Sequence, residues 1–187
     1  MTMINPIDLH TERLVLKPVS LGDVPCYEKH FIDYEVIRHL SDTVPWPYPE
    51  NGVREYVQNQ ILPEQGRDRW IWGIHLRGTP DHLIGVVELW RPGKPENRGF
   101  WLGHEHWGKG YMNEAAYAVT DYAFADLGFD TLIFSNARGN VRSRRVKEKT
   151  GARLLRTEPA EFVDPEYTEQ EIWELTRDDW IAFRQGG

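Results

Sequence analysis

Residues 101–119 of the chain, WLGHEHWGKGYMNEAAYAV, turn from an aromatic, strand-like run into an alanine-rich, helix-like run. From Tyr111 onward the apolar residues recur every three or four positions, which predicts a helix over 111–127. Gly108 and Gly110 therefore lie where a strand passes into a helix. Free N–H groups and the positive end of the helix dipole meet at such a helix start, and glycines let an anion approach closely. The stretch predicts either a tight turn or a phosphate-binding site.

The rest of the chain alternates strand-like and helix-like runs. Short connections that contain glycine and proline separate the three central strand-like runs and indicate antiparallel neighbours. We expect one domain over residues 1–187, of the α/β class, with an α+β mixed sheet and helices packed on it. The predicted strands are 12–19, 69–76, 82–90, 98–103, 131–135, 152–157 and 169–176, and further helices are predicted over 21–40, 53–62 and 140–151.

Composition restricts the class of protein. A chain of 187 residues can bury a large core, and its one cysteine, Cys26, excludes an intramolecular disulfide. We find neither a signal-peptide pattern nor a run of about 18 apolar residues that would span a membrane. The net charge of −7 argues against general affinity for nucleic acid. We expect a cytoplasmic protein, a monomer or homodimer, with no nucleic-acid or membrane partner.

One basic segment departs from this acidic background. From Arg138 to Arg156 the chain carries eight basic residues and one acidic residue, Glu148. Arginines at 142, 144 and 145 fall in the first turns of the helix that begins at Asn140, where the helix dipole repels cations. A bound anion would remove this conflict. Two helix starts, one with glycines and one with arginines, suit a ligand with phosphates in two places, such as coenzyme A.

The glycine pattern differs from two common nucleotide motifs. A dinucleotide-binding turn has a third glycine three residues after the second, and this chain has Asn113 there. A P-loop needs Gly-Lys-Ser/Thr after four intervening residues, and the chain lacks it here. The two glycines therefore suit a pyrophosphate in a ligand other than NAD or ATP.

Longer segments carry a resemblance to a known family. GFWLGHEHWGKGYMNEAAYAVTDYAFADLGFDTL and NARGNVRSRRVKEKTGARLL, in this order, resemble the core of the GNAT N-acetyltransferases. The opening LHTERLVLKPVSLGD and the loop DTVPWPYPENGVREYV are similar to the RimJ/RimL-like branch, the ribosomal-protein acetyltransferases. The resemblance covers residues 11–174. It implies the GNAT fold, with a central, mostly antiparallel sheet whose strands splay, flanking helices, and acetyl-CoA as the acetyl donor.

The resemblance also implies which residues bind acetyl-CoA. The pyrophosphate motif Gln/Arg-x-x-Gly-x-Gly/Ala falls on residues 105–110, and Glu105 departs from its first position. A second motif begins at Asn140, which either contacts the pantetheine or acetyl region or is only a helix cap. Lys109 is expected to face solvent. The implied cofactor-binding set is Leu102, Gly103, Glu105, His106, Trp107, Gly108, Lys109, Gly110, Tyr111, Met112, Asn140, Ser143 and Arg145.

Acetyl transfer to an amine needs a base for the amine and an acid for the leaving thiolate. Many GNAT enzymes have a tyrosine as the acid where this chain has Lys147, and the resemblance makes Ser143 the replacement, with a local cap as its alternative role. Glu88, a carboxylate within an apolar strand, is the candidate base, because desolvation raises the proton affinity of a carboxylate. A solvent-exposed Glu88 is the alternative, and Glu161 is the second candidate base.

The resemblance also implies where the acceptor binds. Trp46 and Tyr48, in a proline-rich loop that resembles the acceptor-side loop of the family, are placed over the acceptor, and Glu88 and Trp101 complete the predicted acceptor-binding set. The acidic body of the chain favours a cationic amine. We expect acetylation of a primary amine, with a protein N-terminal α-amine first and a free small-molecule amine second. A non-catalytic acetyl-CoA sensor is the alternative from another class. Because no convincing third ligand accompanies His104 and His106, no metal is predicted.

Overall fold

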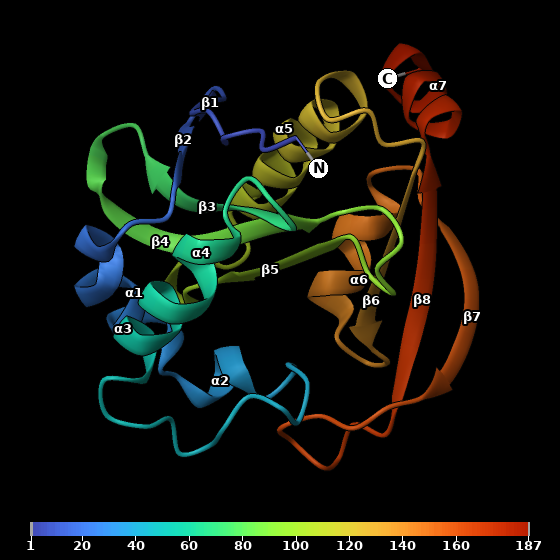
Figure 1. Ribbon diagram of the computed structural model, residues 1–187. Helices are drawn as coiled ribbons and strands as arrows, with labels where there is room; N and C mark the ends of the chain where they lie inside the picture. The colour runs from blue at the N-terminus through green and yellow to red at the C-terminus, as the bar shows by residue number, and fades with distance from the viewer. Residues whose placement is uncertain (1, 187) are drawn as a thin grey trace.

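The computed structural model describes residues 2–186 and arranges its strands in two antiparallel sheets (Figure 1). The larger sheet runs across the molecule in Figure 1, and the smaller sheet stands nearly upright beside it. The larger sheet has the order β1 (Leu9–His10), β2 (Leu14–Pro18), β3 (Arg69–Leu76), β4 (Thr79–Trp90), β5 (Arg98–Leu102). The smaller sheet has the order β6 (Thr131–Ala137), β8 (Glu169–Thr176), β7 (Arg153–Pro159).

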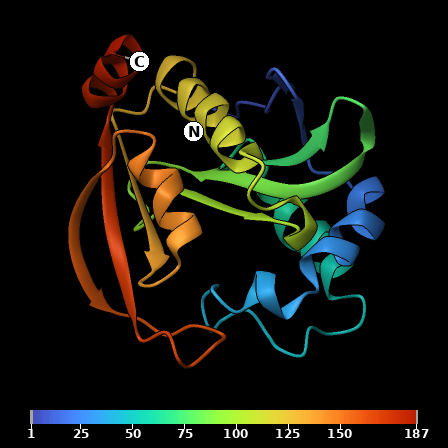
Figure 2. The ribbon, with the colours of Figure 1, turned by 180° about the vertical axis from the view of Figure 1, so that it is seen from behind.

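Helices cover both faces of the larger sheet. Seen from behind in Figure 2, α5 (Tyr111–Ala125) crosses one face, and α6 (Val141–Glu148) lies beside it. The other face carries α1 (Val24–Phe31) and a helical segment made of α3 (Gly52–Tyr56), a π-helical turn and α4 (Leu62–Glu64). Side chains alternate along β3, so Trp70 and Trp72 join the core under α5 while Ile71 joins the core under α1.

The two sheets meet at one end only. The N–H of Asn97 donates to the carbonyl of Ile133 at 2.6 Å, and the Ile133 N–H donates to Asn97 Oδ1 at 2.9 Å. Among the described strands, β5 and β6 are not otherwise paired and belong to separate sheets. The strands therefore diverge from this joint, β5 toward the start of α5 and β6 toward the start of α6.

The predicted order of elements is confirmed, and several bounds match closely. The strands predicted over 69–76 and 169–176 are β3 and β8 without change. Gly128 and Gly151 adopt positive φ values of 72° and 77° just after α5 and α6, as helix-ending glycines do. No helix of the described residues combines the length and the apolar character that crossing a membrane requires.

The helix predicted over 21–40 is wrong in its continuity. It is divided into a short 3-10 turn (Leu21–Asp23), α1 and α2 (Tyr34–Ile37). The break follows Ile32, because Asp33 caps a new helix start by accepting a hydrogen bond from the Glu35 N–H at 2.9 Å. The short strand β1 and the C-terminal helix α7 (Arg177–Gly186) were not predicted. The expected single sheet is two sheets that share the Asn97 joint.

We expect Asn97→Ala to destabilise the fold by about 1–3 kcal/mol, because the change leaves the Ile133 N–H without its acceptor beside the buried Asn97 position. Urea unfolding followed by fluorescence measures this free energy. Asn59→Ala is the control, because Asn59 is exposed on the helical segment. A loss of stability for Asn97→Ala no larger than that of the control would contradict the role of the joint.

Candidate active site

A cavity of about 1200 Å³ occupies the space that the diverging strands leave. The starts of α5 and α6 line one part of it, and α1, α2 and the loop 41–45 line another. Residues of β3, β4, β5 and β6 also line it, as do Tyr48, the helical segment at Tyr56 and Ile61, and the β7–β8 connection. The cavity therefore lies where two helix N-termini and the free edge of β5 face one another.

The start of α5 is built from two glycines in the left-handed region. Gly108 has φ of 74° and Gly110 has φ of 80°, conformations in which a side chain is strained. A Cβ on Gly108 would meet open space. Within residues 2–186 the N–H groups from Gly108 to Met112 donate no hydrogen bond. These donors and the positive helix end form an anion-binding geometry.

Arg13, on the turn between β1 and β2, fixes this loop from outside the cavity. Its Nε donates to Glu114 Oε2 at 2.7 Å, and its backbone N–H donates to Glu114 Oε1 at 2.7 Å. Arg13 Nη1 also donates to the carbonyl of Lys109 at 2.9 Å, and its guanidinium lies 4.7 Å from the centre of the Tyr111 ring. The first turn of α5 and the glycine loop are thus tied to the larger sheet.

The start of α6 brings uncompensated cations to the cavity. Asn140 Oδ1 accepts a hydrogen bond from the Ser143 N–H at 3.2 Å, which confirms Asn140 as the helix cap. The Arg142 guanidinium lies 3.6 Å from the centre of the Trp107 ring, and Trp107 Nε1 donates to the Leu102 carbonyl at 2.8 Å. Arg142, Arg145 and Lys149 line the cavity without an ion pair among the described residues.

The basic segment as a whole does not face this cavity. Arg144 pairs with Glu148 at 2.8 Å and with Glu171 at 2.7 Å, so it already has its anions. Arg138, Arg153 and Arg156 likewise pair with carboxylates of the smaller sheet and α7. The inference that a ligand anion neutralises Arg144 is therefore wrong, because protein carboxylates neutralise it.

Lys147 is buried in the gap between β5 and β6, with 2% of its surface exposed. Its Nζ lies 5.1 Å from the ring centre of Phe100 on β5 and 5.8 Å from that of Phe134 on β6. Nζ donates to Ser143 Oγ at 2.8 Å. Burial, and then the nearby Arg98 guanidinium, hold the pKa of Lys147 well below its ordinary value. Burial also lowers the pKa of Arg98 to about 9.

Aromatic rings gather on the opposite side of the cavity. Trp101 lies 4.9 Å from Tyr27 and 5.1 Å from Phe31 between ring centres, and Phe31 lies 5.3 Å from Tyr48. All four residues line the cavity. Trp46 is 42% exposed and packs on Tyr34, outside the lining of the cavity that the described residues form.

Glu88 projects from β4 into this aromatic part of the cavity. Its Oε2 accepts a hydrogen bond from Arg69 Nη2 at 2.5 Å, and the same Nη2 donates to the Tyr56 hydroxyl at 2.8 Å. Burial raises the pKa of Glu88, although the Arg69 guanidinium opposes the shift. The Glu88 side chain is 17% exposed, so it is more buried than the solvent-exposed Glu88 considered as the alternative from the sequence.

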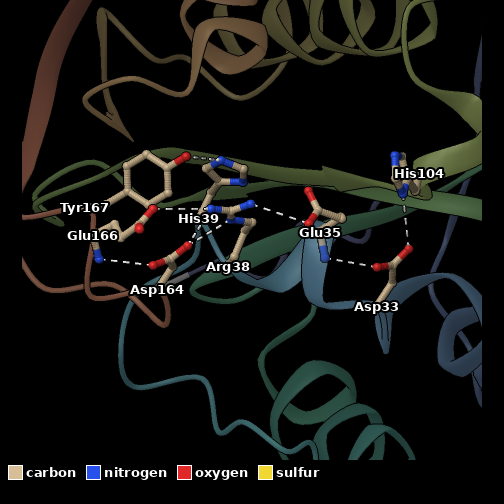
Figure 3. Close-up of polar contacts among 8 residues, drawn as sticks. All are labelled: Asp33, Glu35, Arg38, His39, His104, Asp164, Glu166 and Tyr167. Carbon is tan, nitrogen blue, oxygen red and sulfur yellow. Dashed lines mark hydrogen bonds and ion pairs between the residues drawn. The ribbon is translucent and has the colours of Figure 1, made fainter.

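Two segments far apart in the chain, residues 35–45 and the β7–β8 connection, supply the rim of the cavity and contact each other beside it. Figure 3 shows these contacts. Arg38, after α2, donates from Nε to Asp164 Oδ2 at 2.9 Å, and the His39 ring lies 3.1 Å from the Tyr167 hydroxyl. Figure 3 shows Asp164 and Tyr167, from the β7–β8 connection, turned toward Arg38 and His39. The rim also carries three carboxylates that line the cavity, those of Glu35, Asp42 and Glu161.

Comparison with known proteins identifies this architecture. Residues 13–153 match the acetyltransferase (GNAT) domain family. The chain belongs to the GNAT family. It is 29% identical over 130 residues to the uncharacterised N-acetyltransferase p20 of Bacillus licheniformis, which covers 66% of this chain and 70% of p20. The protein is therefore an acetyl-CoA-dependent N-acetyltransferase.

Two solved structures have the same GNAT fold. RimL, a ribosomal α-N-protein acetyltransferase in complex with coenzyme A, matches with a TM-score of 0.78 and 17% identity, over 92% of this chain and 99% of that one. Spermidine N-acetyltransferase of Vibrio cholerae, in complex with CoA and spermine, matches with a TM-score of 0.76 and 17% identity, over 91% and 99%. At this identity the likeness concerns the fold.

The structure brings most of the predicted GNAT cofactor residues to the cavity. Three of them do not line it within the described chain, namely Gly103, Glu105 and Lys109. The Gly103 N–H donates to the Ile84 carbonyl at 2.8 Å, so the polar backbone groups of alternate residues, Phe100 and Leu102, point to the free edge of β5. Glu105 turns toward α1, and Lys109 is exposed as expected.

Sequence reasoning missed the buried cations of this GNAT site. Lys147 was noted only as the position where a tyrosine is usual, and its contact with Ser143 was not foreseen. The available signal was its spacing, because Lys147 follows Ser143 by one helical turn and adjoins the buried Val146. Arg69 gave no signal as the partner of Glu88, since the pair depends on the register of β3 against β4.

We expect Gly108→Ala to raise the KM for acetyl-CoA at least tenfold, because strain at the positive φ of this residue would shift the loop that presents the free N–H groups. Gly93→Ala is a matched control, since Gly93 also has a positive φ, of 90°, and open space at its Cβ position, in the β4–β5 turn. Each substitution costs about 1–2 kcal/mol of folding stability through backbone strain. Steady-state kinetics in which both variants change KM equally would contradict the assigned role of Gly108.

Proposed function

We propose that this N-acetyltransferase acts on the N-terminal α-amine of a protein, as a RimJ/RimL-like enzyme. The observation that carries the proposal is the polarity of the cavity. Free helix N–H groups, Arg142, Arg145 and Lys149 line its cofactor side, and Glu35, Asp42 and Glu161 line its rim. An acidic rim attracts a cationic amine. Asp42 and Glu161 are exposed, so an acceptor can extend from the cavity into solvent, as a polypeptide N-terminus requires.

On the cofactor side, we propose that the starts of α5 and α6 bind different parts of acetyl-CoA. The N–H groups from Gly108 to Met112 would bind the pyrophosphate, and Arg142, Arg145 and Lys149 would neutralise further phosphate charge. The free edge of β5 offers the backbone groups of Phe100 and the N–H of Leu102 to the pantetheine arm, while the Leu102 carbonyl accepts from Trp107 Nε1. This arrangement directs the thioester toward the gap in which Ser143 and Lys147 lie.

For the acid we propose the Ser143–Lys147 pair. When the neutral amine nitrogen bonds to the thioester carbon, it loses a proton to the base, and the carbon–sulfur bond breaks with its electron pair remaining on sulfur. The Ser143 hydroxyl then gives its proton to the thiolate, and the Lys147 ammonium, 2.8 Å from Ser143 Oγ, returns a proton to the serine. A buried ammonium with a lowered pKa suits this task, because it gives up a proton more readily than an exposed lysine.

For the base we propose Glu88. Its position among Tyr27, Tyr56 and Trp101 gives the aromatic acceptor side a carboxylate. Its raised pKa increases its affinity for the proton that the amine nitrogen loses on bonding to the thioester carbon. The ion pair with Arg69 uses Oε2. The proton would therefore be taken up at Oε1, directly or through a water molecule.

A free polyamine is the second candidate acceptor, and the three rim carboxylates favour it. Mass spectrometry of acetylated products separates the two, with a panel of peptides of varied N-terminal residue beside spermidine and spermine. The proposal expects α-acetylated peptide with a kcat/KM at least tenfold above that for the polyamines. Higher kcat/KM for the polyamines, or acetylation confined to lysine side chains, would contradict it.

The Ser143–Lys147 pair predicts a loss of kcat with no loss of stability. Lys147→Met should lower kcat by about a hundredfold, in the range of general acid catalysis. It should also maintain or raise the melting temperature, because it removes a buried charge that makes no ion pair with the described residues. In the parent enzyme kcat should fall as the pH rises through the lowered pKa of Lys147, and in Lys147→Met that alkaline limb should disappear. Unchanged kcat in both Lys147→Met and Ser143→Ala would contradict the assignment.

The proposed role of Glu88 as the base predicts how kcat/KM depends on pH on the acidic side. Because its carboxylate must be unprotonated to act as a base, kcat/KM should fall as the pH drops through a pKa above the ordinary carboxyl value. Glu88→Gln should remove this limb and lower kcat/KM by about a hundredfold. Glu161→Gln, which changes a rim carboxylate that also lines the cavity, is the matched control. A pH profile altered by Glu161→Gln and not by Glu88→Gln would transfer the role to Glu161.

A further inference from the structure

A second polar cluster lies beside the turn that leads into the glycine loop, between α1 and the 3-10 turn His104–His106. His30 comes from α1, and Glu105 and His106 come from the turn. One ligand atom from each residue lies within 4.8 Å of the others. His30 Nδ1 is 3.4 Å from Glu105 Oε1, and His106 Nε2 is 3.8 Å from the same oxygen. A surface cavity of about 500 Å³, lined in part by His30 and Glu105, adjoins the cluster.

Contacts on the side away from Glu105 hold the imidazole ring of His30 in place. His30 is 4% exposed, and its Nε2 lies 2.9 Å from Nε2 of His82 on β4. The other nitrogen of His82, Nδ1, lies 3.4 Å from the Cys26 sulfur. When His30 carries its proton on Nε2, it donates this proton to His82 Nε2. The other ring nitrogen of His30, Nδ1, then has a free lone pair that faces Glu105. Metal-binding histidines are oriented in this way, by a hydrogen bond from the second ring nitrogen.

One polar atom of the cluster has no hydrogen-bond partner among the described residues. This atom is the buried Nε2 of His106. The Glu105 carboxylate has one cation within 4 Å besides the histidines, Lys29 Nζ at 3.8 Å. The GNAT motif has Gln or Arg where this chain has Glu105, and the Glu105 side chain turns away from the acetyl-CoA cavity. The pyrophosphate site therefore does not account for its position.

We propose that His30 Nδ1, His106 Nε2 and the Glu105 carboxylate bind one divalent transition-metal ion of the zinc class. Two imidazole nitrogens and one carboxylate suit such an ion, and water would complete the coordination. Bonds of about 2.0–2.2 Å in a tetrahedral site place ligand atoms roughly 3.4 Å apart, close to the spacings seen here. Small rotations of the exposed Glu105 side chain bring its oxygen into range.

Such an ion would act on the acetyl-CoA loop, because His106 precedes Gly108 by two residues. Bound metal would join the turn to α1 and reduce the motion of the backbone that presents the free N–H groups. We expect the KM for acetyl-CoA to fall severalfold on loading. This consequence rests on the proposed function of the glycine loop, whereas metal binding itself does not.

The direct test is a titration of the metal-stripped full-length protein with Zn²⁺ by calorimetry and with Co²⁺ by visible absorption. The proposal expects one ion per chain. It also expects affinity to fall at least tenfold in Glu105→Gln and in His106→Gln, and by roughly tenfold to a hundredfold in His82→Phe, which changes only the group behind His30. His104→Gln is the control, since His104 lies in the same turn and faces Asp33.

The two proposals fail in distinguishable ways. If the folded protein, checked by circular dichroism, takes up no Zn²⁺, or binds it equally well in Glu105→Gln, His106→Gln and His104→Gln, the metal site is wrong. That outcome leaves acetyl transfer untouched. If the ion binds as expected and the KM for acetyl-CoA does not change, the coupling to the glycine loop is wrong and the site is an independent one.

Discussion

The active site depends on a joint that holds two sheets together at one end only. Asn97 and Ile133 exchange two hydrogen bonds, and beyond them β5 and β6 diverge. Divergence frees the edge of β5, opens the cavity and directs two helix starts at the same space. A continuous sheet would bury this edge in strand pairing and leave no room for a ligand between the helices. The binding chemistry is therefore a consequence of backbone topology before any side chain is considered.

The cavity has a positively charged side although the chain as a whole is acidic. Most arginines of the basic segment are neutralised by carboxylates, and only a few cations remain for a ligand. Lys147 is the extreme case, because it is buried beside Arg98 and makes no ion pair with any described residue, Glu96 and Glu171 acting on it only from a distance. Burial of an unpaired charge lowers stability. An apolar side chain would fill the same gap at lower cost, so the buried ammonium supports the proposal that Lys147 acts together with Ser143 as the acid.

Local patterns in the sequence predicted local structure well. Gly108, Gly110 and Asn140 were placed at helix starts because capping and glycine preferences act within a few residues. Features that depend on distant contacts were not predicted. The ion pair between Arg38 and Asp164 joins residues far apart in the chain, and the Arg69–Glu88 pair depends on strand register. Trp46 packs on Tyr34 through the path of its loop. Within residues 101–119, the motif itself was clear, yet the outward turn of Glu105 required the structure.

The central claim is that one cavity holds the pyrophosphate at the start of α5 and the thioester at Ser143 and Lys147. A crystal structure of the protein with coenzyme A tests it most directly. The account predicts pyrophosphate oxygens that accept hydrogen bonds from N–H groups between Gly108 and Met112, with the thiol in the gap between β5 and β6 facing Ser143. A pyrophosphate bound away from these N–H groups, or a thiol directed away from α6, would contradict it.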